Sequence, residues 1–154
     1  MIVYADTSAL GSVYLRDEAD APWLRDLLDN FNSVGTLIVT SELTDVELAS
    51  LVARAARSHR IDGPTAEDCL RAYAADTANS GPIGVLLLDR ETLARAAHYV
   101  VRTATRSLDA IHLAAAAHCA EQFGDDVQVL TRDVRQAAAA AALGIPLHPR
   151  STTD

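Results

Sequence analysis

Short apolar runs alternate with stretches of helical hydrophobic spacing along the whole chain. The runs occupy residues 1–5, 36–40, 83–88 and 127–131, and they are rich in valine, isoleucine and leucine. Runs of this length indicate buried strands, and their alternation with helices is typical of a parallel sheet. The pattern therefore predicts an α/β domain of three layers, in which a mostly parallel sheet is flanked by helices.

The intervals between these runs have the apolar spacing of amphipathic helices. A helix is expected to begin at residue 90, and the others cover residues 8–15, 22–31, 41–59, 65–78, 107–123 and 133–143. Ser41 and Asp89 are suitable N-caps, and Gly144 is a suitable C-cap. Residues 145–147 are expected to form a short edge strand, where proline is tolerated.

Four acids stand where predicted strands end or where predicted helices begin. Asp6 and Asp133 follow the first and last apolar runs, and Glu47 and Asp109 lie in early turns of helices, on faces that are otherwise apolar. The carboxyl ends of parallel strands share one edge of the sheet, which is where ligands bind in open α/β folds. We therefore expect the four carboxylates to meet in one cleft at that edge.

Four clustered carboxylates need a counter-charge, because they cannot all stay ionised side by side. The chain offers no lysine for this purpose, since all 13 of its Lys and Arg side chains are arginines. Hard divalent cations are the natural alternative, and Mg²⁺ prefers a few carboxylates together with water. One or two such ions can activate a water at a phosphodiester and stabilise the leaving oxygen.

Each acid also has a purely structural explanation. Asp6 and Asp133 are suitable helix N-caps, and Asp109 complements the dipole of its helix. Glu47 suits an ion pair with Arg54 or Arg57. The functional interpretation therefore depends on the four acids together and not on any one of them.

The histidines and arginines of the predicted helices are expected either to support the site or to face solvent. His112 shares a stripe with Asp109 and is expected to be a buried histidine behind the site. The arginines at 54, 57 and 60 are typical of a solvated helix face. The other histidines form no ligand pattern.

Composition limits the class of protein further. The chain has 154 residues, enough for one domain, and a net charge of −8, so it lacks the broad basic surface of many nucleic-acid-binding proteins. Without lysine, P-loop and Schiff-base chemistry are excluded.

Cys69 and Cys119 lie far apart in helical patterns and are expected to be buried free thiols, as in a cytoplasmic protein. No signal peptide or membrane span is apparent.

At this point the sequence resembles the PIN-domain ribonucleases, and most closely the VapC-type toxins of bacterial toxin–antitoxin pairs. Four segments in order, covering nearly the whole chain, are similar to the motifs of that family: Tyr4–Leu10, Ser41–Glu47, Leu108–Ala116, and Leu130–Asp133 followed by Leu143–Ile145. Arg132 departs from the tyrosine or asparagine that is more common at its place.

The resemblance implies a five-stranded parallel sheet between helices in a single PIN domain over residues 1–149, with a frayed tail at 150–154. It implies endonucleolytic cleavage of RNA that depends on Mg²⁺ or Mn²⁺, usually by a homodimer, and an antitoxin that places a basic side chain in the cleft. The implied catalytic and metal-binding residues are Asp6, Glu47, Asp109 and Asp133, with support from Thr7, Ser8, Thr131 and His112.

Two alternatives belong to other classes. One is a PIN-like module that binds RNA or a partner without cutting, which the complete set of acids disfavours. The other is a phosphatase with an aspartyl nucleophile at Asp6. That chemistry needs a second acid two residues later, where this chain has Ser8.

Overall fold

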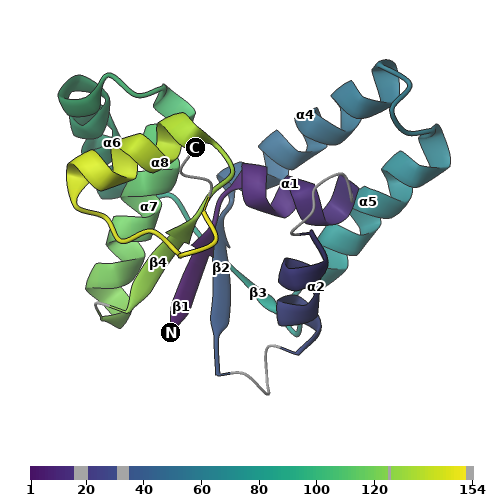
Figure 1. Cartoon of the computed structure of the whole chain (residues 1–154), viewed down its shortest axis with the longest axis horizontal. Coiled ribbons are helices and arrows are strands. Elements are labelled where there is room, and N and C mark those ends of the chain that lie inside the picture. The colour runs from purple at the N-terminus through teal and green to yellow at the C-terminus, as the bar shows by residue number, and fades with distance from the viewer. Residues whose placement is uncertain (16–20, 31–34, 125, 152–154) are drawn as a thin grey trace.

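The structure, a computed structural model, describes residues 1–15, 21–30, 35–124 and 126–151. Within these residues the sheet has four strands, all parallel, in the order β3-β2-β1-β4 (Figure 1). The strands are β1 (Ile2–Ala5), β2 (Leu37–Ser41), β3 (Ile83–Leu86) and β4 (Val127–Leu130). The four predicted strands and their parallel arrangement are confirmed.

Two groups of helices cover the two faces of the sheet, so the three-layer prediction is confirmed (Figure 1). One group comprises α1 (Thr7–Leu15), α2 (Ala21–Asp29), α4 (Leu43–Arg57) and α5 (Gly63–Asp76). The other comprises α6 (Arg90–Thr103), α7 (Ser107–Phe123) and α8 (Val134–Leu143). Asp89 caps α6 and Gly144 ends α8 in the left-handed region, as expected.

The inner strand β1 contributes to both hydrophobic cores because successive side chains of a strand point to opposite faces. Val3 and Ala5 pack with the group that contains α1 and α4, and Tyr4 packs with α7 and α8. All three residues are fully buried. Burial on both faces explains why the run has no polar residue before Asp6.

The fifth strand is the first difference from the expectation. The segment after α8 forms only a single bridge, between Leu147 and Val129. The Val129 N–H donates to the Pro146 carbonyl, and the Val129 carbonyl accepts from the His148 N–H. Pro146 has no N–H to continue a ladder, so the pairing stops there.

Two other segments differ from the expectation at one end each. Ser41 is not an N-cap: it pairs with Leu86 as the last residue of β2, and α4 begins at Leu43. Residues 150 and 151 are not frayed, because Ser151 is buried and its Oγ donates to the Val129 carbonyl. Residues 152–154, and Phe31 at the expected end of a helix, lie outside the described residues.

Both cysteines are buried free thiols, as expected. None of the helices in the described parts of the chain is long and apolar enough to cross a membrane.

Candidate active site

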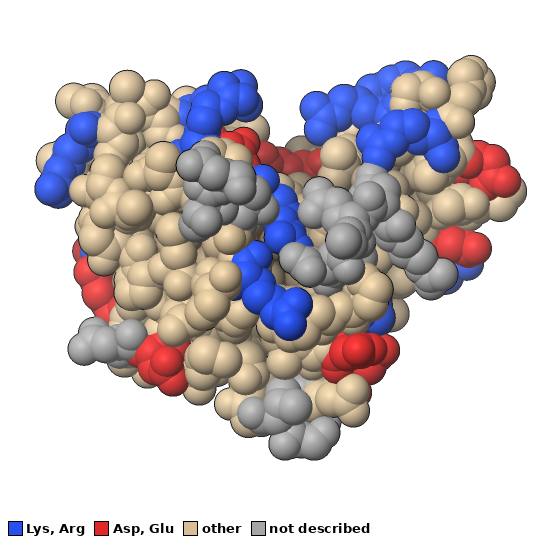
Figure 2. All heavy atoms as spheres, in the orientation of Figure 1, with Lys and Arg blue, Asp and Glu red and all other residues tan. Residues whose placement is uncertain are grey.

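A cleft of about 570 Å³ opens at the carboxyl edge of the sheet, between the two groups of helices. All four predicted acids line it: Asp6, Glu47, Asp109 and Asp133. They come from the end of β1, from α4, from the first turn of α7 and from the start of α8. Figure 2 shows acidic side chains within this cleft and arginines on both sides of its rim.

Asp6 is held rigidly at the floor of the cleft, with 1% of the residue exposed. Its Oδ1 accepts hydrogen bonds from Ser8 Oγ at 2.7 Å and from the Ala9 N–H at 2.8 Å, and its Oδ2 accepts from Thr131 Oγ1 at 2.5 Å. The bond from Ala9 satisfies a free N–H in the first turn of α1. Asp6 therefore caps a helix and also lines the cleft, so the two explanations of this residue are compatible.

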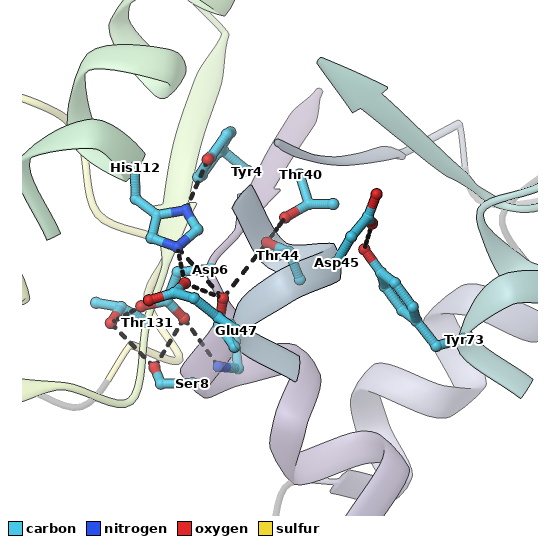
Figure 3. Close-up of polar contacts among 12 residues, drawn as sticks. Tyr4, Asp6, Ser8, Thr40, Thr44, Asp45, Glu47, Tyr73, His112 and Thr131 are labelled. Carbon is cyan, nitrogen blue, oxygen red and sulfur yellow. Dashed lines mark hydrogen bonds and ion pairs between the residues drawn. The ribbon is translucent and has the colours of Figure 1, made fainter. Parts of the chain in front are cut away.

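Glu47 is fixed by two partners from other elements (Figure 3). Its Oε2 accepts from Thr7 Oγ1 at 2.5 Å and lies 2.7 Å from Nε2 of His112. The opposite ring nitrogen, Nδ1, lies 2.9 Å from the Tyr4 hydroxyl. The alternative explanation, an ion pair with Arg54 or Arg57, does not account for this position, because Thr7 and His112 orient the carboxylate.

The two remaining acids differ in their hydrogen bonding. Asp133 Oδ1 accepts from the backbone N–H groups of Arg135 and Gln136, so this residue caps α8. Asp109 Oδ2 is buried, but no described residue donates a hydrogen bond to it. A buried carboxylate oxygen without a donor is costly, and it marks a place where a ligand would be stabilising.

Two hydroxyls tie the loop after β4 to the loop after β1. Ser8 Oγ accepts from the Arg132 N–H at 2.7 Å, and Thr131 Oγ1 accepts from the Asp133 N–H at 3.0 Å. Both hydroxyls also donate to Asp6, so they fix the position of the loop after β4 relative to Asp6. The four residues predicted to support the site, Thr7, Ser8, Thr131 and His112, each contact one of the acids.

Close packing of α1 on α4 brings Thr7 to Glu47. A Cβ on Gly11 would collide with Leu51 Cδ2, so glycine at that position lets the Leu51 side chain pack directly on α1. Leu51 also lines the cleft beside Glu47.

The environment of each acid alters its ionisation differently. Burial raises the pKa of Asp6 above its ordinary value. Burial also raises the pKa of Asp109, and repulsion from Asp133 adds to this effect. Burial opposes the ionisation of Glu47 as well, but the hydrogen bonds from the imidazole and the threonine hydroxyl outweigh it and lower its pKa. Such opposed shifts within one cleft are typical of functional sites.

The donor set suits a hard divalent cation, although the side chains are not gathered around one point. In the described residues, no three His, Cys, Asp or Glu side chains lie close enough together to hold an ion. The donors that line the cleft are nevertheless carboxylate oxygens, which Mg²⁺ and Mn²⁺ prefer. The unpartnered Asp109 Oδ2 is the oxygen that most needs such a ligand.

Three contributors to this site were not predicted from the sequence. Arg54 lines the cleft and is not merely part of a solvated face, and Arg106, just before α7, lines it from the other side. Tyr4 was not expected to contact His112. A buried tyrosine hydroxyl normally finds a partner, and this is the signal that was available.

The fold and the cleft define a class: an α/β domain with a parallel sheet and an acidic site at the carboxyl edge of that sheet. The chain belongs to the PIN domain family, whose model matches residues 3–142. It is similar to a solved structure, the crystal structure of VapC20 from Mycobacterium tuberculosis, described as a sarcin-ricin loop cleaving toxin. The TM-score is 0.62 and the sequence identity 17%, over 89% of this chain and 94% of that one. A comparison with curated proteins finds no significant match.

Proposed function

We propose that this protein is a metal-dependent endoribonuclease and the toxin of a VapC-type toxin–antitoxin pair. The observation that carries the proposal is the convergence of Asp6, Glu47, Asp109 and Asp133 on one cleft in a chain of the PIN domain family. The likeness to a toxin that is named for cleaving an RNA loop supports RNA as the substrate.

The residues of the chain have separable tasks in this reaction. Asp109 and Asp6 would hold a Mg²⁺ or Mn²⁺ ion, with Glu47 and Asp133 direct or through water. When bound, such an ion supplies charge neutralisation and an activated water at the phosphodiester. Ser8 and Thr131 keep both oxygens of Asp6 in a fixed orientation.

Glu47 presents an ionised carboxylate to a water in the cleft. Its lowered pKa keeps it ionised, and the bonds from Thr7 and His112 engage only its Oε2. Solvent reaches the carboxylate, since 21% of the Glu47 side chain is exposed. Arg54 and Arg106 stand on opposite sides, where they can offset the repulsion between the acids and RNA phosphates.

The proposed partners are RNA in the cytoplasm and an antitoxin protein. An acidic cleft on a protein of net charge −8 suits an inhibitor that inserts an arginine or lysine. By the same resemblance we infer that the toxin acts as a homodimer, which forms a larger complex with its antitoxin.

The test is a cleavage assay on structured RNA with the purified protein. Cleavage is expected with Mg²⁺ or Mn²⁺, and it should be lost with EDTA and in Asp6→Asn and Asp109→Asn. Arg90→Gln, an exposed change at the start of α6, is the control that should cut like the parent. RNA binding without cleavage in every metal would instead favour a non-catalytic PIN-like module.

A further inference from the structure

A second pocket, of about 340 Å³, lies beside the acidic cleft. It is formed where the turn between α6 and α7 faces α8, and it shares two residues with the cleft, Arg106 and Asp109. The two hollows therefore adjoin each other at Arg106 and Asp109. A polymer that occupies the cleft has the second pocket as its immediate neighbour.

The wall of this pocket combines arginines with alanines. Arg106 and Arg135 are exposed, and neither makes an ion pair or side-chain hydrogen bond with another residue in the described parts of the chain. The alanine run of α8 supplies a smooth apolar surface through Ala138, Ala139 and Ala142. These alanines have no role in the cleft itself.

This combination matches the chemistry of a nucleotide. Guanidinium groups pair with phosphate oxygens and also stack on base planes. A floor of methyl groups accepts the face of a base or ribose without competing for hydrogen bonds. The volume is within the range of small-molecule sites, which begins at about 300 Å³.

The geometry points to a nucleotide subsite of the RNA strand in this second pocket, adjacent to the scissile bond, with Arg106 and Arg135 on the phosphates and the α8 alanines under the base. The inference rests on the proposed function, because it takes RNA as the ligand of the neighbouring cleft. It assigns Arg135 and Ala142 as positioning residues that contact RNA outside the carboxylate site.

The backbone makes this pocket a preformed feature. Ala104 adopts a left-handed conformation, with φ of 53°, and its N–H donates to the Val100 carbonyl at the end of α6. The turn therefore reverses direction within a few residues and delivers Arg106 to the start of α7. On the other side, Asp133 caps α8 and fixes the first turn, which carries Arg135.

The experiment measures RNA binding apart from cleavage. The dissociation constant of a fluorescein-labelled oligouridine is measured by anisotropy in buffer with Ca²⁺ at several salt concentrations, and the RNA is checked for integrity afterwards. The variants are Arg135→Gln and Ala142→Leu. Matched controls are Arg90→Gln, at the opposite end of α6, and Ala141→Leu, an exposed alanine of α8 that does not line the pocket.

Arg135→Gln is expected to weaken binding on the order of fivefold and to reduce the salt slope by about 0.7, the share of one phosphate contact with a single strand. Ala142→Leu should weaken binding by filling the pocket, with no change in the salt slope. Arg135→Lys should restore the slope but not the full affinity, because lysine lacks the planar fork. Both controls should bind as the parent does.

The inference is overturned if Arg135→Gln and Ala142→Leu bind RNA as the parent does, or if the controls weaken binding equally. Unchanged RNA binding with loss of antitoxin binding would assign the pocket to a protein partner instead. Each variant is compared with the parent by thermal melting, so that a folding defect is recognised. If RNA is never cut but binds in this arginine-dependent way, the subsite stands and the nuclease proposal fails.

Discussion

Nε2 of His112 lies 2.7 Å from Oε2 of Glu47, and this contact joins α7 to α4 across the cleft. On the far side of the ring, Nδ1 faces the Tyr4 hydroxyl at 2.9 Å. Burial raises the pKa of Tyr4, so its phenol stays neutral and is able to donate. A neutral imidazole that accepts at Nδ1 carries its proton on Nε2, where it donates to Glu47.

This arrangement predicts that His112 orients Glu47. His112→Ala should lower the free energy of unfolding by roughly 2–4 kcal/mol, because it leaves a cavity and removes the partner of the buried Tyr4 hydroxyl. It should also slow RNA cleavage strongly, whereas His112→Gln, which retains a donor, should recover part of both. The exposed His98 of α6 gives the control, His98→Ala. An Nδ1–H tautomer in the ¹⁵N spectrum of the parent would contradict the assignment.

A second prediction concerns the unpartnered Oδ2 of Asp109. Asp109→Asn removes a carboxylate whose pKa is raised by burial and by Asp133, so it should stabilise the metal-free protein. We expect a gain on the order of 0.5 kcal/mol, because the residue is half-exposed and the repulsion is partly screened. Denaturant unfolding at pH 7.5 with EDTA measures it. Asp6→Asn should show no such gain, since both oxygens of Asp6 already accept hydrogen bonds.

The pH dependence of the metal-free protein follows from the same two acids. Asp6 and Asp109 have raised pKa values, so the folded protein holds protons that the unfolded chain has released. Their contribution to stability is present below the ordinary carboxyl pKa of about 4, and it is lost as pH rises through the raised values.

Divalent cations should reverse this trend, because they bind the ionised form of the folded protein. The rise in Tm on adding Mg²⁺ or Mn²⁺ should be larger at pH 7.5 than at pH 5, and it should shrink in Asp109→Asn. An equal rise in parent and variant would show that Asp109 belongs to no metal site.

His148 predicts an opposite pH effect, away from the cleft. Burial and the charge of Arg150 lower its pKa, and its ring packs on Trp23 with centroids 5.1 Å apart. Its contribution to stability is therefore present above the ordinary pKa of about 6.5, and it is lost as pH falls toward the lowered value. His148→Phe keeps the ring and removes the titration. The Tm of the parent should fall more than that of His148→Phe between pH 7.5 and pH 5.5.

Backbone strain at Ala104 gives a further prediction. Its φ of 53° suits glycine, so Ala104→Gly should raise the free energy of unfolding by about 1 kcal/mol. Ala94→Gly, at an exposed interior position of α6, should lower it by a similar amount. If both changes destabilise equally, Ala104 is not strained.

The sequence was informative where local pattern decides the structure. Four short apolar runs became strands because each contributes side chains to the cores on both faces of the sheet. Asp89 and Gly144 became caps because capping needs only neighbouring residues. The convergence of the four acids followed from one rule about parallel sheets.

The predictions that failed concern positions whose structure depends on residues far away in the sequence. Ser41 has the composition of a cap, but its pairing with Leu86 extends β2 and delays the helix. Ser151 is anchored by Val129, which no local pattern near the end of the chain reveals. Arg106 lines both hollows only because a tight turn places it there, and nothing in its sequence neighbours distinguishes it from other surface arginines.

The bond from Thr131 to Asp6 spans 125 positions of the sequence. A chain that is still being synthesised therefore has no complete set of acids until nearly all of it has left the ribosome and β4 has docked beside β1. Closing so long a loop is slow compared with forming helices. The polypeptide is therefore finished for an interval before its acidic cleft is assembled.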